Sequence, residues 1–160
     1  MKMSIVTFYR CDPKDAPKTT MKTHLGANAI ITCGGRLLLE RRSDSDIWGL
    51  IGGGVKKHES TEDGMIREIY EELGIRVSKA ELRKLKVYDD PGRIAAFRDG
   101  SVWKMVIAVY ALEFSQEPVM KISTESKELR FFTKEEIRNI PLAVTHQDII
   151  EECFLHRTWS

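Results

Sequence analysis

The sequence lacks the features that mark several large classes of protein. Its three cysteines, Cys11, Cys33 and Cys153, lie far apart and form no C-x-x-C pair. Such scattered cysteines are neither a disulfide framework nor a thiolate metal site, and they suit a reducing cytosol. The longest apolar stretch, at 105–112, has the length of a strand and is far shorter than the ~20 residues that span a bilayer. The chain is therefore expected to be cytoplasmic and without a membrane partner.

An excess of charge of one sign is also missing. The formal net charge is +1, whereas proteins dedicated to nucleic acids usually carry a basic surplus, so no nucleic-acid partner is expected. The apolar run before Arg10 is too short for a signal peptide. With 160 residues, the chain has the length of one domain with a proper core. Residues 1–160 are expected to form that domain, with a lead-in at residues 1–22.

Strand patterns and helix patterns follow one another along the chain, and no repeat or low-complexity tract interrupts them. Strands are predicted at 25–32, 36–42, 82–88, 93–97, 102–114 and 128–132. Helices are predicted at 61–73, after Thr133, and from Thr145 onward, the last with an apolar side made of Ile149, Ile150, Cys153 and Phe154. This order predicts an α/β (α+β) fold with helices packed on the faces of a mixed sheet.

The helix predicted at 61–73 has clear signals at both ends. Ser60 can cap its N-terminus, with Asp63 three residues later, and Gly74 provides a C-terminal stop. On a helical wheel one wide arc, which is expected to pack against the sheet, contains Met65, Ile66, Ile69, Tyr70 and Leu73.

Three carboxylates, Glu68, Glu71 and Glu72, share the arc beside this apolar face. A solvated acidic face is the ordinary explanation, but such faces usually place Lys or Arg four residues after each Glu. Here Glu72 follows Glu68 at that spacing, which is repulsive. A divalent cation would relieve the repulsion, and oxygen-only ligands indicate Mg²⁺, or Mn²⁺, rather than zinc.

A magnesium site of this kind suits a phosphate substrate. Mg²⁺ bound by carboxylates also binds phosphate oxygens. The negative charge of a phosphate hinders the attack of water on phosphorus, and the metal ion neutralises that charge. The glycines at 52–54 would let the backbone approach metal or phosphate closely, although a plain tight turn also explains them.

Residues 53–75 carry a longer pattern: Gly53, five residues, Glu59, seven residues, then Arg67-Glu68-Ile69-Tyr70-Glu71-Glu72-Leu73-Gly74-Ile75. This segment resembles the complete signature of the Nudix (MutT-like) hydrolases, G-x5-E-x7-R-E-U-x-E-E-x-G-U, where U is a bulky aliphatic residue. The resemblance implies an α/β/α sandwich and Mg²⁺-dependent hydrolysis of a nucleoside diphosphate linked to another moiety.

The resemblance also implies roles for individual residues. Glu68, Glu71 and Glu72 would bind the metal, together with the carbonyl of Gly52. Glu59 would assist that site or orient a ligand, and Arg67 would tie down the loop by ion pairing. The general base differs among members of the family, and Glu125 and Glu128 are the candidates here on a later loop. The candidates for substrate contact are Gly53, Arg41, Tyr88 and Phe97, the two aromatic residues by base stacking.

The substrate is left open among three alternatives. ADP-ribose or a similar nucleotide sugar is favoured, because a proline tends to follow the signature by about sixteen residues in relatives that cleave ADP-ribose, and Pro91 lies there; any turn could also select it. The second alternative is a nucleoside triphosphate cleaved to monophosphate and pyrophosphate. The third is a module that senses a nucleotide without cleaving it. A homodimer is suggested by the family alone.

Three positions depart from the common pattern of the family. Ile51 stands where many relatives have proline, Lys56 where they have an acidic residue, and His58 where they have glycine. These changes are expected to affect the geometry of the loop and the choice of substrate more than metal binding.

Overall fold

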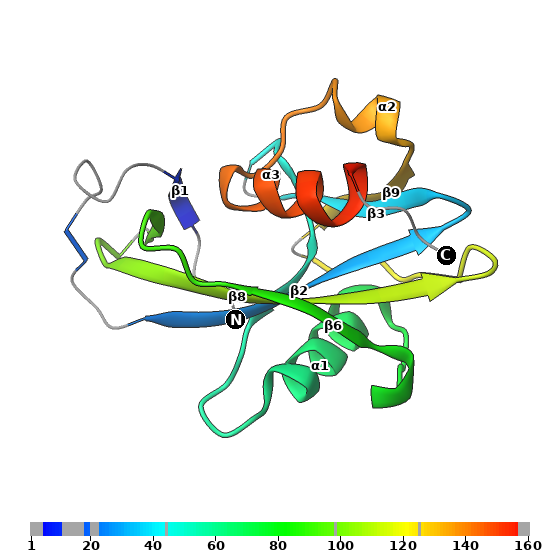
Figure 1. The fold of residues 1–160 in the computed structure, drawn as a ribbon, viewed down its shortest axis with the longest axis horizontal. Coiled ribbons are helices and arrows are strands. Elements are labelled where there is room, and N and C mark those ends of the chain that lie inside the picture. The colour runs from blue at the N-terminus through cyan, green and yellow to red at the C-terminus, as the bar shows by residue number, and fades with distance from the viewer. Residues whose placement is uncertain are drawn as a thin grey trace.

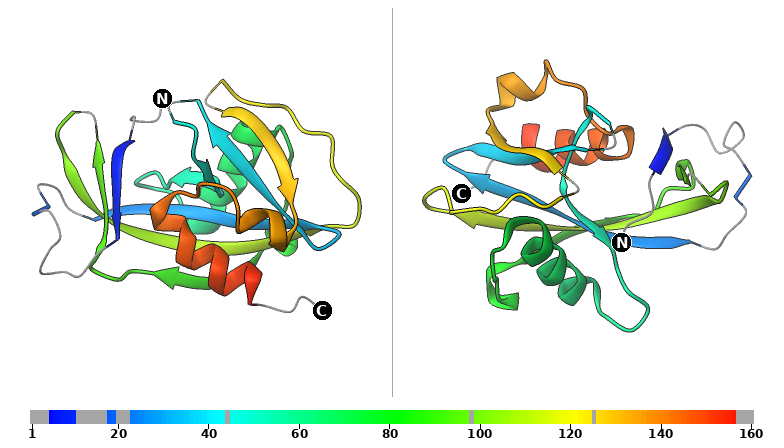
Figure 2. Two further views of the ribbon diagram at one scale, coloured as in Figure 1. Left: turned by 90° about the horizontal axis from the view of Figure 1, so that it is seen from above. Right: turned by 180° about the vertical axis from the view of Figure 1, so that it is seen from behind.

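The computed structural model describes residues 5–10, 18–19, 23–43, 45–97, 99–124 and 126–156. A twisted sheet forms its middle layer, with α1 (Thr61–Leu73) on one face and α3 (Val144–Ile150) on the other (Figure 1). The two further views confirm that these helices lie on opposite sides (Figure 2). The α/β/α sandwich is therefore present. Within the described residues, no helix has the length and apolar character needed to cross a bilayer.

The sheet is mixed and is organised around two long central strands. The described residues contribute nine strands to it: β1 (Ile5–Arg10), β2 (His24–Cys33), β3 (Arg36–Arg42), β4 (Trp48–Gly49), β5 (Ile51–Gly54), β6 (Arg83–Tyr88), β7 (Arg93–Phe97), β8 (Val102–Phe114) and β9 (Ser126–Phe132). β2 and β8 run parallel, and β8 also pairs antiparallel with β6 and β7. β2 pairs with β5 and β3, while β3 pairs with β4 and β9. β1 pairs with β7.

Alternate residues of β2 contribute to two separate cores, because successive side chains of a strand point to opposite faces. Ala27, Ala29 and Ile31 pack under α1 with Met65 and its apolar neighbours. Ile30 belongs to the core on the other face, under α3. Ile149, Ile150, Cys153 and Phe154 form the buried side of the last helix, as predicted. This helix continues as a π-helical turn, Glu151–Leu155.

All six predicted strands are present, but the structure corrects three other assignments. The glycines at 52–54, which a tight turn could explain, belong to β5, and Trp48 and Gly49 form β4, because pairing with β2 and β3 orders segments with little strand propensity of their own. The lead-in at 1–22 contains β1. Thr145 does not cap α3: the helix begins at Val144 after Ala143, and Thr145 is buried within it.

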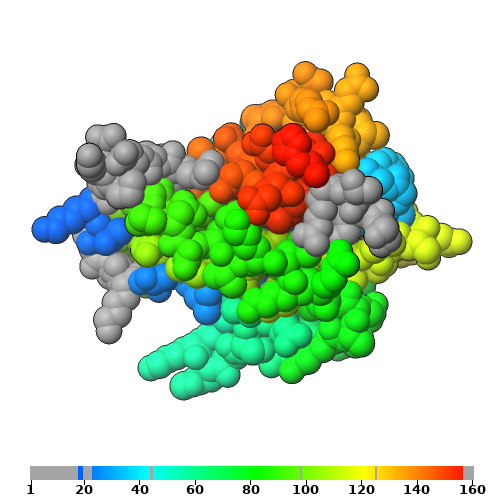
Figure 3. All heavy atoms as spheres, in the orientation of Figure 1, coloured from blue at the N-terminus to red at the C-terminus, as the bar shows by residue number. Residues whose placement is uncertain are grey.

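The last helix is held to the sheet by polar contacts as well as by the core. Figure 3 shows its end lying against the segment of β6, where Lys86 Nζ and Glu152 Oε1 are 2.9 Å apart. Deeper inside, Arg93 is fully buried on β7 and pairs with Asp148 of α3 at 2.5 Å. It also donates to the carbonyl of Thr145. These contacts set the position of the N-terminal turn of α3 relative to the sheet.

Candidate active site

The acidic helix α1 is built largely as its sequence predicts. Tyr70 is the exception: it was expected on the buried arc but is 45% exposed, because the sheet does not cover its edge of the arc and its ring lies under the guanidinium of Arg76 at 4.3 Å. Ser60 Oγ accepts a hydrogen bond of 3.0 Å from the Asp63 N–H, and Gly74 ends the helix in the left-handed conformation at φ 73°. Met65, Ile69 and Leu73 are completely buried against β2. Because these three residues fix the rotation of the helix about its axis, the carboxylates beside them are directed toward β5.

The carboxylates on this helix differ in burial. Glu68 and Glu72 are only 3% and 2% exposed, and the side chain of Glu71 is half exposed. The Gly52 N–H donates to Glu72 Oε2 at 3.2 Å. A Cβ on Gly53 would stand 2.6 Å from Glu68 Oε1, so any side chain at this position would force the Glu68 carboxylate to move. The glycines of β5 therefore allow the helix carboxylates to lie directly against the backbone.

Arg67 is the counter-charge of this acidic cluster. Its Nη2 donates to Glu59 Oε1 at 2.6 Å and to the Gly54 carbonyl at 2.9 Å. Its Nη1 donates to Glu68 at 3.1 Å and to Glu71 at 3.2 Å. The hydrogen bond from Arg67 lowers the pKa of Glu59, and the same bond raises the pKa of Arg67. The predicted ion pair that ties down the loop is thus present.

The donor atoms at this site are of the kind that binds a hard divalent cation, although the side chains do not converge on a single point. The donors are all carboxylate and carbonyl oxygens, the kind that Mg²⁺ and Mn²⁺ prefer. Among the residues that the structure describes, no three His, Cys, Asp or Glu side chains stand together so that they could hold a metal ion. Arg67 lies between Glu68 and Glu71 instead.

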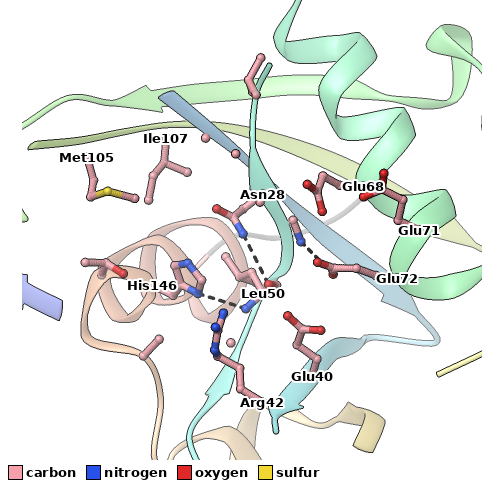
Figure 4. A pocket seen from close by; sticks show the side chains of 18 of the residues that line it. Asn28, Glu40, Arg42, Leu50, Glu68, Glu71, Glu72, Met105, Ile107 and His146 are labelled. Atoms are coloured by element: carbon pink, nitrogen blue, oxygen red, sulfur yellow. Dashed lines mark hydrogen bonds between the residues drawn. The ribbon is translucent and has the colours of Figure 1, made fainter. Parts of the chain in front are cut away.

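A cavity of about 580 Å³ opens beside the acidic helix and extends across the sheet toward α3. Glu68, Glu71 and Glu72 border one side of it, and Met105, Ile107 and His146 lie on the opposite side, with Asn28 between them (Figure 4). This volume lies within the range of ordinary small-molecule sites. One cavity thus joins a cluster of anionic oxygens to an apolar surface.

The apolar end is built on the first residues of β2 and β8. His24, Phe97, Met105 and Ile107 line it. The ring of His24 is 6.1 Å from that of Phe97 and stands edge-on to Trp103 at 5.5 Å, between centroids. Burial lowers the pKa of His24, so this imidazole is neutral at pH 7. The end of the cavity opposite the acidic helix is therefore largely aromatic and uncharged.

His146 holds α3 to the strands that precede the acidic helix. The Leu50 N–H donates to its Nδ1 at 3.1 Å. Burial, with help from the charges of Arg93 and Arg42, lowers the pKa of His146 to about 4. The ring is therefore neutral at pH 7 and carries its proton on Nε2, because Nδ1 serves as the acceptor.

This neutral histidine predicts a loss of stability in mild acid. Between pH 6.5 and about 4 the unfolded chain protonates His146 and the folded chain does not, so the free energy of unfolding falls as the pH drops through that window. Replacing His146 with Gln, which can still accept from Leu50, should remove about 3 kcal/mol of this change in the free energy of unfolding. Urea unfolding at a series of pH values measures it. An equal pH dependence in both proteins would contradict this origin; the exposed His156→Gln is the control.

Most of the predicted site residues are brought together. Gly52, Gly53, Arg67, Phe97 and the three helix glutamates line the cavity, and Glu59 lies behind Arg67. Tyr88 does not line it, because it faces the core under α3, where its hydroxyl contacts Glu152 and Cys153.

The later-loop candidates and Arg41 have a different placement. Arg41 and Glu128 pair with each other at 3.3 Å on neighbouring strands, and neither is among the residues that line the cavity. Glu125 lies outside the described residues. The assignment of a general base to Glu125 or Glu128 therefore stays a prediction.

Several residues that line the cavity were not predicted from the sequence. Asn28 and Glu40 are buried polar residues of β2 and β3, and Glu40 accepts a hydrogen bond of 2.6 Å from Ser126. Arg42 and His146 come from β3 and α3. A polar residue in an apolar strand pattern, as at Asn28 and Glu40, is the sequence signal that could have marked two of them.

The departures in the signature loop are accommodated without strain. Among the described residues none other than glycine has a positive φ, so His58 adopts an ordinary backbone conformation in an exposed turn. The Lys56 N–H donates to Glu59 at 2.8 Å, and Lys56 also lines the cavity.

Comparison with known proteins agrees with this architecture. The sequence model of the NUDIX domain matches residues 22–153. The chain is 31% identical over 132 residues to a MutT-like protein of Streptomyces ambofaciens, covering 81% of this chain and 75% of that protein. It is 26% identical over 114 residues to the nucleoside triphosphatase NudI of Enterobacter sp. (strain 638), covering 68% and 80%.

A solved structure shows the same fold. The bifunctional NMN adenylyltransferase/ADP ribose pyrophosphatase of Francisella tularensis, in complex with AMP and a manganese ion, superposes with a TM-score of 0.62 at 20% identity, over 88% of this chain and 44% of that one. The chain thus spans less than half of that two-activity protein. The family match over most of the sequence, together with the cavity beside the signature helix, establishes that the chain belongs to the Nudix hydrolases.

Proposed function

We propose that this Nudix hydrolase cleaves the pyrophosphate bond of ADP-ribose or a similar nucleotide sugar, with Mg²⁺ or Mn²⁺ as cofactor. The observation that supports this most is the cavity itself, which places buried carboxylates at one side and the apolar residues Phe97, Met105 and Ile107 at another. A nucleoside diphosphate has the same division, since its phosphates are anionic and its base is flat and largely apolar. The Francisella neighbour named an ADP ribose pyrophosphatase supports the choice.

The chain's own residues would provide the metal site. Glu68, Glu71 and Glu72 would hold the ion with the carbonyl of Gly52, once Arg67 gives up its contacts with Glu68 and Glu71. A cation held there would supply positive charge to the diphosphate and would lower the pKa of a bound water. Met65, Ile69 and Leu73 keep the helix in place while its carboxylates change partners, because all three are fully buried.

A second candidate is the hydrolysis of a nucleoside triphosphate to monophosphate and pyrophosphate. The observation in its favour is the 26% identity to a protein named nucleoside triphosphatase. Pro91, the sequence feature that favoured ADP-ribose, lies in an exposed turn before β7 and is not among the residues that line the cavity. The preference for ADP-ribose therefore rests on the apolar end of the cavity and on the Francisella neighbour.

A substrate panel tests the proposal. ADP-ribose and the common nucleoside triphosphates are incubated with the protein and Mg²⁺, and the products are separated by chromatography, with EDTA as the control. Release of AMP and ribose 5-phosphate supports the proposal. Release of pyrophosphate from a triphosphate supports the second candidate. Binding without turnover of any compound would contradict both and would indicate a sensing module.

A further inference from the structure

One face of β2 forms a floor in the cavity. His24, Gly26 and Asn28 all line it, as expected for alternate residues of one strand. The residues between them, Leu25 and Ala27, point to the other face, and Ala27 is buried against α1. Gly26 pairs with Ile107 of β8, which also lines the cavity. The floor is therefore flat at Gly26 and has a polar side chain at each end.

The amide of Asn28 has only one orientation that satisfies its neighbours. Its Nδ2 donates to the carbonyl oxygens of Leu50 at 3.4 Å and Ile51 at 3.3 Å. Both partners can only accept, so the NH₂ group must face them and Oδ1 must point away. Figure 4 shows the amide in this orientation, between Glu68 and Ile107.

The Oδ1 atom of Asn28 is thereby presented as an acceptor. The residue is only 7% exposed, and within the described part of the chain no donor bonds this oxygen. This oxygen is not one of the fully buried side-chain atoms that lack a partner, so it is open to the cavity that Asn28 lines, where it can accept a hydrogen bond from water or from a ligand. The environment therefore suits a ligand that brings its own donor.

The rest of this end of the cavity fits a flat ring. Phe97, Met105 and Ile107 supply apolar contact, and His24 is neutral, with a buried Nδ1 that has no partner among the described residues. Apolar walls with a few polar atoms at the edge match a nucleobase, whose faces stack and whose edge forms hydrogen bonds. An acceptor at the edge selects a base with an amino group.

We propose that Asn28 is a specificity-determining residue whose Oδ1 accepts a hydrogen bond from the 6-amino group of adenine, bound over Gly26 and beside Phe97. The choice of adenine rests on the proposed function. A base with a carbonyl oxygen at this edge would place two acceptors against each other. Because Nδ2 is held by Leu50 and Ile51, the amide cannot rotate to donate to such a base without breaking both bonds.

The test compares the affinities for AMP and for purine riboside 5′-monophosphate, which lacks only the amino group. Calorimetry on the wild-type protein should show about tenfold tighter binding of AMP. Asn28→Leu should bring the ratio of the two affinities close to one. Equal affinities in the wild type, or an unchanged ratio in Asn28→Leu, would overturn the proposal.

Using a ratio separates recognition from a structural role. If Asn28 only held Leu50 and Ile51 in place, Asn28→Leu would weaken the binding of both ligands alike, and the ratio of their affinities would not change. The wild-type comparison needs no variant, so it decides the matter even if Asn28→Leu does not fold. Because binding is measured without turnover, a protein that prefers AMP but does not release AMP from ADP-ribose would keep this inference and lose the proposed function.

Discussion

Replacing Glu72 with Gln is expected to lower turnover by about a thousandfold, equivalent to roughly 4 kcal/mol of the activation barrier. Glu72 is almost completely buried in the cavity wall, so its charge acts on a bound cation with little screening by water. The substitution keeps the size of the side chain and an oxygen that can accept from the Gly52 N–H. Steady-state kinetics on the best substrate of the panel measures the effect.

The fold of this variant should stay intact. Neutralising Glu72 removes a buried charge next to the other acidic groups of the cavity, so the metal-free Glu72→Gln protein should melt at the same temperature as the wild type or a few degrees higher. Glu62→Gln, in the first turn of the same helix and away from the cavity lining, is the matched control and should keep full activity. Unchanged turnover in Glu72→Gln would remove Glu72 from the site.

Replacing Arg67 with Gln is expected to destabilise the metal-free protein by about 2 kcal/mol. Its guanidinium contacts Glu59, Glu68, Glu71 and the carbonyl of Gly54, and it is only 21% exposed. Without it these carboxylates repel one another and lose their donors. Added Mg²⁺ should raise the melting temperature of the variant more than that of the wild type, because the ion supplies the missing positive charge. Thermal melts with and without Mg²⁺ measure both effects.

The stabilisation of the folded protein by Arg67 should decrease as the pH falls. Pairing with Arg67 lowers the pKa of Glu59 in the folded protein, so this stabilisation is present at neutral pH and is lost as the pH falls through that lowered pKa. The difference in stability between wild type and Arg67→Gln should therefore narrow in acid. Arg67→Lys, which keeps the charge but not the several fixed donors, should lie between the two. A metal-free Arg67→Gln protein as stable as the wild type would contradict the assignment.

The signature helix could be predicted almost residue by residue because its determinants are local. Ser60 and Gly74 set its ends through contacts within one turn. The spacing of Met65, Ile69 and Leu73 sets the buried side. The acidic helix face follows from that same spacing and from no other part of the chain.

The opposite side of the cavity could not be predicted in this way. Asn28 and His146 reach it from β2 and α3, more than a hundred residues apart. Tyr88 was predicted at the site but lies elsewhere. As an aromatic residue on a strand it could face either side of the sheet, and in the structure it faces the core beside Cys153. Local propensity does not decide which face of a strand is covered and by what.

The sequence by itself indicated the family, the fold class, the acidic helix, an ion-pairing role for Arg67, and the kind of cation that the helix oxygens suit, whereas the structure identified Glu59 as a partner of Arg67. The fold class follows from the order of strand and helix patterns along the chain. The other features depend on residues within a single segment, where spacing along the chain sets distance in space. The tertiary structure alone decided that residues 48–49 and 51–54 are strands, that Asn28 and His146 border the cavity, and that Tyr88 does not. Those facts depend on strand register and on the docking of α3, which arise from contacts between segments far apart in the chain.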